Sequence, residues 1–207
     1  MEADRNRLPG KAIEFLVGPT PSENAIRSLP VNLISHHAPY FKRTCMWIEN
    51  ELIRIPEHDH AVFGLFVEWM YYGSYNSSTS PKHPNINAKC WILGDYLICT
   101  GIKNYALSRL YTEHKATSFG IPVSFEDVQY VCNNTSPDSK LRQFYLDFVP
   151  DNFGDLCWLL GNIFDWERFL EDHPDLRSAL IWNLRFGPPK KPHVKSLSKY
   201  LVPETLA

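Results

Sequence analysis

The segment HDHAVFGLFVEWMYYG, residues 58–73, is the strongest structural signal in this 207-residue chain. Asp59 is suited to begin a helix, because its carboxylate can accept hydrogen bonds from the free amides of the first turn. Apolar residues then recur at the spacing of one helical face, and Gly73 is suited to end the helix. These apolar residues are Val62, Phe63, Phe66, Val67 and Met70. We therefore predict a helix that begins after Asp59 and ends at Gly73.

Three short strands are predicted before this helix. The segment AIEFLVG places an isoleucine, a phenylalanine and a valine on one face, which favours a strand over residues 12–17. Turn residues in PTPSE follow it, and residues 24–29 fit a partner strand. A short helix is predicted over residues 31–39, and ELIRIP, residues 51–56, fits a brief third strand.

The rest of the chain has helical spacing. Helices are predicted around residues 90–98, 102–110, 125–132, 141–148, 153–160, 166–170 and 176–184. Ser124 is placed to cap the third of these, and Pro174 separates the last two. We therefore predict an α+β fold: a small, mostly antiparallel sheet capped by helices, followed by a helical extension.

The predicted organisation has four parts. Residues 1–11 form an N-terminal segment, 12–114 the α+β domain and 115–186 the helical extension. The final segment, 187–207, has four prolines, four lysines and few residues that could form a core, so we predict a disordered tail. Its lysines lack flanking arginines, which favours a solvated tail over a nucleic-acid patch.

Composition excludes several classes of partner. The formal net charge is −2, so no long-range field attracts nucleic acid or an acidic membrane. The N-terminus, MEADRNRLPGK, lacks the apolar region of a secretory signal, and no apolar run approaches a membrane span. The five cysteines include no C-x-x-C pair and indicate free thiols in a reducing compartment. We expect an intracellular protein of the cytoplasm, the nucleus or both.

Histidines provide the main candidates for metal or acid–base chemistry. His36 and His37 are adjacent, and neighbours on a helix point about 100° apart, whereas helical metal pairs need i, i+4 spacing. The segment EHDH, residues 57–60, is better explained as the loop before a helix, with Asp59 as its cap and the imidazoles in water. No nucleophile elbow or phosphate-binding glycine loop is present. We predict no catalytic residue, cofactor or metal; an enzyme or metal protein built from distant residues is the remote alternative.

Three segments in order resemble the BTB/POZ domain: LPVNLISHHAPYF, WIENELIRIPEHDHAVFGLFVEWMYYGSY and WILGDYLICTGIKNYALSRL. In that family a strand pair precedes a helix that ends at an aromatic corner. A loop with an aromatic-x-Glu pattern, a short strand, a helix ending in Trp-x-Tyr-x-Gly and a closing helix pair follow. The segment EDVQYVCNNTSPDSKLRQFYLD is similar to the extension of short BTB proteins of filamentous fungi.

The resemblance implies a protein–protein interaction module without catalytic activity. Tyr40 and Phe41 occupy the aromatic corner and are expected core or groove residues. Trp47, Ile48 and Glu49 match the hydrophobic-x-Glu loop with which BTB adaptors dock onto cullin-3-class ubiquitin ligase scaffolds. The predicted partner-binding residues are therefore these five, and a cullin-linked substrate adaptor is the alternative function.

The chain also departs from the family pattern. Leu29-Pro30-Val31 stands where Val-His-Lys is common, and only eleven residues precede the first strand, where dimeric members place an extra helix. A strand-swapped homodimer of that kind is therefore not expected. The sequence is compatible with a monomer or with self-association through another surface.

The adaptor alternative predicts that the purified chain binds the N-terminal domain of a cullin-3-class scaffold. We expect a Kd in the micromolar range or tighter, about −8 kcal/mol, measured by calorimetric titration. The double variant Trp47→Ala with Glu49→Lys should lose this binding while keeping its circular dichroism spectrum. No binding by a folded, monodisperse wild-type sample would contradict the adaptor function.

Overall fold

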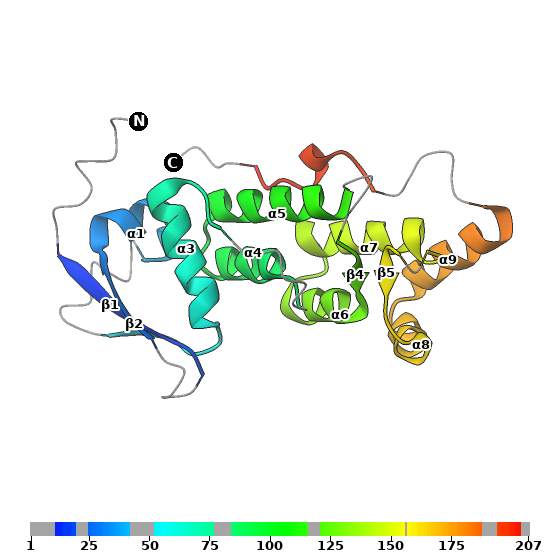
Figure 1. Ribbon diagram of the computed structural model, residues 1–207, viewed down its shortest axis with the longest axis horizontal. Helices are drawn as coiled ribbons and strands as arrows, with labels where there is room; N and C mark the ends of the chain where they lie inside the picture. The colour runs from blue at the N-terminus through cyan, green and yellow to red at the C-terminus, as the bar shows by residue number, and fades with distance from the viewer. Residues whose placement is uncertain are drawn as a thin grey trace. The chain divides into compact units, whose positions relative to one another are not determined.

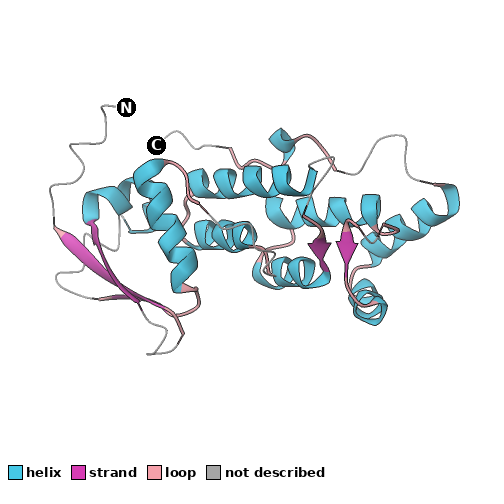
Figure 2. Ribbon diagram, in the orientation of Figure 1, coloured by secondary structure: helices cyan, strands magenta, loops and turns pink. Residues whose placement is uncertain are grey.

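The computed structural model describes residues 11–19, 25–41, 52–76, 84–115, 121–155, 157–187 and 194–203. The chain divides into two compact units. Unit 1 comprises Met1–Ser78, Lys89–Tyr105 and Glu204–Ala207, and unit 2 comprises Thr79–Ala88 and Ala106–Pro203. Helix predominates in the described residues, with strands in two small groups (Figure 2). The predicted α+β class is confirmed.

Unit 1 contains a three-stranded sheet in the order β2-β1-β3. β1 (Ala12–Val17) pairs antiparallel with β2 (Ala25–Pro30) and parallel with β3 (Ile53–Ile55). Phe15 of β1 lies opposite Arg27 on one side and Ile53 on the other. The three apolar positions that the alternation predicted for β1 are buried, so all three strand predictions are confirmed.

The helices of unit 1, two of which continue into unit 2, are α1 (Val31–His37), α3 (His60–Tyr72), α4 (Ile86–Tyr96) and α5 (Thr100–Lys115). Helix α3 begins and ends as predicted. Asp59 accepts a hydrogen bond from the Ala61 N–H at 2.7 Å, and Gly73 ends the helix at φ 69°, a conformation that only glycine adopts readily. Within the unit α3 lies against the sheet (Figure 1), with the Phe63 ring 5.5 Å from that of Phe15.

Unit 2 is mainly helical. Its remaining elements are β4 (Val123–Ser124), α6 (Phe125–Asn134), α7 (Lys140–Asn152), β5 (Leu159–Leu160), α8 (Ile163–Glu171), α9 (Pro174–Phe186) and a 3-10 turn over Leu197–Lys199. The predicted cap at Ser124 is confirmed: its hydroxyl accepts from the Asp127 N–H at 3.1 Å. No helix in the described part of the chain is both long enough and apolar enough to cross a membrane.

The helix predicted over residues 153–160 is wrong. α7 ends at Asn152, and the Asp155 carboxylate accepts a hydrogen bond from the Cys157 N–H at 2.8 Å, which makes a turn. Leu159 then pairs in parallel with Val123 as part of the β4/β5 pair. The apolar spacing of this segment is real, but pairing with a strand 36 positions earlier in the chain overrides it.

The segment 194–203 is ordered, although the sequence predicted a disordered tail there. Tyr200 is fully buried; its hydroxyl donates to Asp147 at 2.8 Å and accepts from the Lys195 N–H at 2.8 Å. The Val194 N–H donates to Asp151 at 2.9 Å. Burial raises the pKa of Tyr200 far above its ordinary value, so this hydroxyl stays a donor. One aromatic residue thus anchors a segment whose composition alone indicates disorder.

The division between the units lies inside α4 and α5, whereas the sequence placed a boundary between residues 114 and 115. Residues 79–88 belong to unit 2. The reason lies in two asparagines: the Asn85 N–H donates to Asp127 at 2.7 Å, and the Asn87 amide donates to both oxygens of Glu113 at 2.9 Å. These bonds join the start of α4 to α5 and α6 within unit 2.

Substitution of Asp127 should strongly reduce the stability of the chain. Its side chain is completely buried and accepts from two backbone N–H groups, those of Ser124 at 2.9 Å and Asn85 at 2.7 Å. Asp127→Ala leaves both donors buried without an acceptor, so we expect a loss of about 2–4 kcal/mol in the free energy of unfolding. Chemical denaturation followed by circular dichroism measures it.

The matched control is Glu126→Ala, one position earlier. Glu126 is exposed and lies in the same first helical turn, so its removal should cost at most about 1 kcal/mol, through the helix dipole. Equal losses in the two variants would contradict the role given to Asp127.

Candidate protein-interaction site

Helices α6 and α8 are positioned by the parallel pair β4/β5. Val123 lies opposite Leu159, and Ser124 lies opposite Leu160. α6 follows β4 directly, and α8 follows β5 after two residues, so both helices start at the same end of the pair. Asn162 caps α8 by accepting from the Phe164 N–H at 3.0 Å. The local chain therefore sets two helices side by side.

Aromatic rings close the space between these helices. The Phe125 ring of α6 lies 5.9 Å from that of Phe169 and 5.1 Å from that of Trp166, both edge to face. Gly161, at φ +143°, allows this approach, because a Cβ there would lie 2.6 Å from the Trp166 Nε1 and 2.7 Å from the Phe125 Cβ. A side chain at position 161 would push these rings apart.

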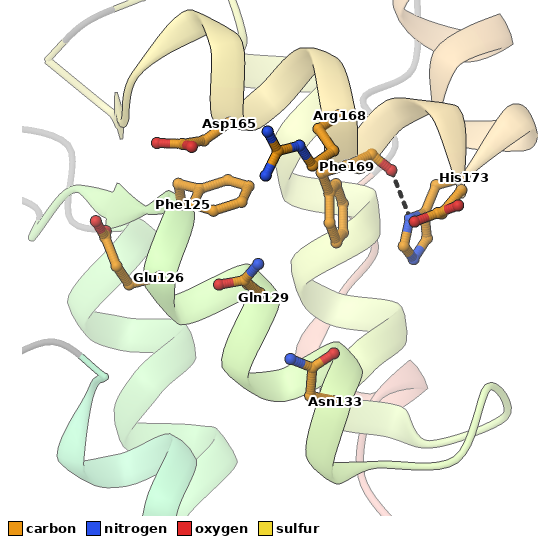
Figure 3. A pocket seen from close by; sticks show the side chains of 9 residues that line it. Phe125, Glu126, Gln129, Asn133, Asp165, Arg168, Phe169 and His173 are labelled. Carbon is orange, nitrogen blue, oxygen red and sulfur yellow. Dashed lines mark hydrogen bonds between the residues drawn. The ribbon is translucent and has the colours of Figure 1, made fainter.

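Above these rings is a hollow of about 390 Å³, which we call the α6–α8 groove. Phe125 and Phe169 point into it from opposite helices, and polar side chains stand along both sides (Figure 3). Its lining residues are Phe125, Glu126, Gln129, Asn133, Asp165, Arg168, Phe169, Asp172 and His173.

The polar side chains of the groove follow one helical stripe on each side. Positions 126, 129 and 133 of α6 are spaced i, i+3, i+7, and so are positions 165 and 168 of α8 and its C-cap residue 172. Each stripe spans roughly 10 Å of helix. None of these six side chains forms a hydrogen bond or ion pair with another described residue. Their hydrogen-bonding groups are available to a partner.

His173, at the end of the groove, has hydrogen-bond partners that match one tautomer of the imidazole. Its Nε2 lies 3.3 Å from an Arg142 guanidinium nitrogen, which can only donate, so Nε2 is the acceptor. The Nδ1 lies 2.8 Å from the Phe169 carbonyl oxygen and is therefore the donor. Apart from His173, the groove holds three carboxylates and one guanidinium, a local charge of 1 − 3 = −2.

The predicted site residues in unit 1 have different environments. Phe41 is fully buried, with its ring 5.1 Å from that of Phe15, so it fixes the corner to the sheet. Tyr40 is 39% exposed, and its ring lies 5.7 Å from that of Tyr96. Trp47, Ile48 and Glu49 lie outside the described residues. The role of all five in partner binding stays a prediction.

His58 corrects one expectation. The sequence placed the imidazoles of residues 57–60 in water, and His60 is exposed. His58 is instead partly buried, with its ring 5.0 Å from that of Tyr96, because the loop folds against α4. Burial lowers the pKa of His58 and the nearby Glu57 opposes that shift. Burial raises the pKa of Tyr96, and the neighbouring Tyr40 raises it further.

His36 and His37 lie at the end of α1, with their rings 4.8 Å apart and edge to face. His36 is exposed, whereas the His37 ring packs 5.2 Å from that of Trp69, edge to face. Within the described ranges, no three His, Cys, Asp or Glu side chains converge where they could hold a metal ion. Burial raises the pKa values of the Cys99 and Cys132 thiols, which keeps them protonated at neutral pH.

The sequence did not reveal the groove. The two stripes of polar residues spaced i, i+3, i+7 can be found in the sequence. The solvent-facing side of any surface helix has the same pattern, so the stripes alone do not indicate a groove. Only the pairing of β4 with β5 shows that the stripes face a common hollow. A scan against protein-family models found no match, and a search of curated proteins found none either.

The His58 environment predicts a pH dependence of stability. Because its pKa is lowered on folding, the unfolded chain binds the proton more readily, and protonation favours unfolding. Neutral His58 therefore leaves the stability of the fold unaffected above about pH 6.5, the ordinary histidine pKa, and stability falls as the pH drops below this value. We therefore expect His58→Gln to reduce the fall in melting temperature between pH 7 and pH 5, measured by differential scanning fluorimetry.

His60→Gln is the control, because it removes an exposed imidazole two residues away. It should follow the wild-type pH profile. Parallel profiles for wild type and His58→Gln would contradict the assigned environment of His58.

Proposed function

We propose that the chain is a non-catalytic protein-interaction module of the BTB/POZ type with a helical extension. The order of elements in unit 1 supports this proposal. An antiparallel strand pair precedes a helix with an aromatic corner, a short strand, a helix ending in Trp-x-Tyr-x-Gly, and a helix pair. The sequence resemblance implies the same order. Because one fold can serve many functions, the proposal also depends on surfaces that could bind a partner.

The first proposed surface is the aromatic patch of Tyr40, His58 and Tyr96. Tyr40 and Tyr96 are each about two-fifths exposed, at 39% and 40%. Tyrosines that expose a ring edge and a hydroxyl give large contact area at low entropy cost, which makes them frequent interface anchors. Tyr40 also precedes the Trp47-Ile48-Glu49 segment in sequence, so the patch and the proposed cullin-docking loop are close along the chain.

The second proposed surface is the α6–α8 groove. Gln129 and Asn133 each offer a carbonyl oxygen and an amide donor, the same pair of groups that a peptide bond presents. The groove has a local charge of −2 above apolar rings, which suits a partner segment with a lysine or arginine whose aliphatic stem covers the rings. We propose that a target protein binds here.

The cullin-3-class adaptor is the second candidate function, favoured by the Trp47-Ile48-Glu49 pattern. In that case the groove holds the protein to be modified, and the chain links it to the scaffold. The general interaction module and the adaptor differ in one requirement: only the adaptor needs a cullin among its partners.

Affinity enrichment from host extract with three matched double variants tests the proposal. Tyr40→Ala with Tyr96→Ala removes the aromatic patch, and Gln129→Ala with Asp165→Ala removes an amide and a carboxylate from the groove. Tyr71→Ala with Tyr72→Ala removes exposed rings elsewhere in unit 1 and is the control. Quantitative mass spectrometry compares the proteins that each bait retains.

We expect the control to retain every wild-type partner and each test variant to lose a distinct set, by at least tenfold. Purified partners should then show the same losses in direct titration. Recovery of nothing beyond the empty matrix would overturn the interaction-module proposal. Identical recovery by all four baits would overturn both assigned surfaces.

A further inference from the structure

Helix α9 exposes large apolar side chains to an unusual degree. Ile181, Trp182, Leu184 and Phe186 are 58%, 63%, 78% and 61% exposed. Only Leu176 and Leu180 of this helix are buried. Since successive residues are about 100° apart, these four residues spread over an arc of about 200° of the helix surface, which also contains the exposed Arg185. A helix of this kind is ordinarily covered by another surface.

One stripe along the outer side of α9 has a particular order. Asp175, Ser178, Trp182 and Arg185 are spaced three, four and three residues apart, and all four are exposed. This spacing confines them to an arc of about 80°. The stripe therefore presents, in sequence, an acid, a small residue, a large ring and a base.

We propose that α9 is a homodimer interface, in which the α9 helices of two copies pack antiparallel about a two-fold axis near residue 180. This inference goes beyond the proposed function and does not depend on it. In this arrangement Asp175 faces Arg185 of the second copy, and Ser178 faces Trp182 of the second copy. Each pair occurs twice, as a two-fold interface requires.

Charge and size both select a second copy as the partner. Neither Asp175 nor Arg185 forms an ion pair with another described residue, so the acid and the base remain to be matched. Antiparallel packing matches them and also sets the two helix dipoles in opposition. Ser178 leaves room for the Trp182 indole of the other copy, so a small residue faces a large one in both of the symmetry-related pairs. A chain with a net charge of −2 adds little repulsion to the pair.

Three of the exposed apolar residues of α9 contribute area to this interface. Trp182 lies on the stripe and Ile181 and Phe186 flank it, whereas Leu184 lies on the side of the helix nearer α7. An aromatic side chain buries about 150–250 Å² when fully covered, so these three partly exposed residues supply on the order of 350 Å² per copy. A standard interface buries about 800 Å² per partner with its apolar part in the centre, so they form that centre and the polar residues of the stripe surround it.

Sedimentation velocity across a concentration series tests the proposal with the full chain. We expect a reversible dimer at about 100 µM, where a micromolar Kd gives near-complete association. Trp182→Glu should weaken the dimer at least tenfold. Tyr72→Glu is the control, because Tyr72 is 77% exposed in unit 1 and lies outside the stripe. All variants alter exposed residues, so circular dichroism should confirm that each remains folded.

A charge exchange tests the antiparallel register. Asp175→Arg alone and Arg185→Asp alone each place like charges opposite one another and should weaken the dimer several-fold. The double variant that combines both changes restores opposite charges and should recover wild-type association. A wild-type chain that stays monomeric at about 100 µM overturns the proposal, whatever other partner α9 then has. A dimer that Trp182→Glu leaves intact, or that the double charge exchange does not rescue, overturns it as well.

Discussion

The helical unit depends on one buried carboxylate. Asp127 has no exposed surface, and it accepts hydrogen bonds from the backbone amides of Ser124 and Asn85. A buried carboxylate is stable only when its oxygens are satisfied, so both amides must stay in place. The first bond starts α6, and the second joins the residues before α4 to the same point. The position of Phe125, directly after Ser124, follows from this arrangement.

The groove is a consequence of that fixed starting point. β4 ends where α6 begins, and its pairing with β5 sets the start of α8 at the same end. Gly161 then lets Trp166 and Phe125 approach to contact distance, which closes the base of the groove and leaves the polar stripes on its sides. A base of packed rings, with polar groups above it that bond no other described residue, suits recognition, because preorganised groups lower the cost of ordering a site on binding.

Sequence reasoning succeeded where the deciding contacts are local. The caps at Asp59 and Ser124 bond to groups within three residues, so their residue types were sufficient to predict them. It failed where a distant residue decides. The Asn85 and Asp127 pair spans 42 positions, and Tyr200 reaches Asp147 across 53. Composition indicated disorder for the residues around Tyr200, because it measures the average and not the single ring that anchors them.

Helix α9 shows a further limit of periodicity. Leu180 and Leu184 are one turn apart and share a face, yet Leu180 is 4% exposed and Leu184 is 78% exposed. Asn183 still reaches α7, donating to the Pro150 carbonyl at 3.0 Å, but Leu184 borders a hollow of about 260 Å³ at the end of that helix. Apolar spacing thus states which side chains favour burial, and the length of the neighbouring helix decides which of them the chain itself can bury. The exposed apolar side chains of α9 can leave water only by contacting another molecule. The order of acid, small residue, large ring and base along α9 is complementary to the same order read in the opposite direction.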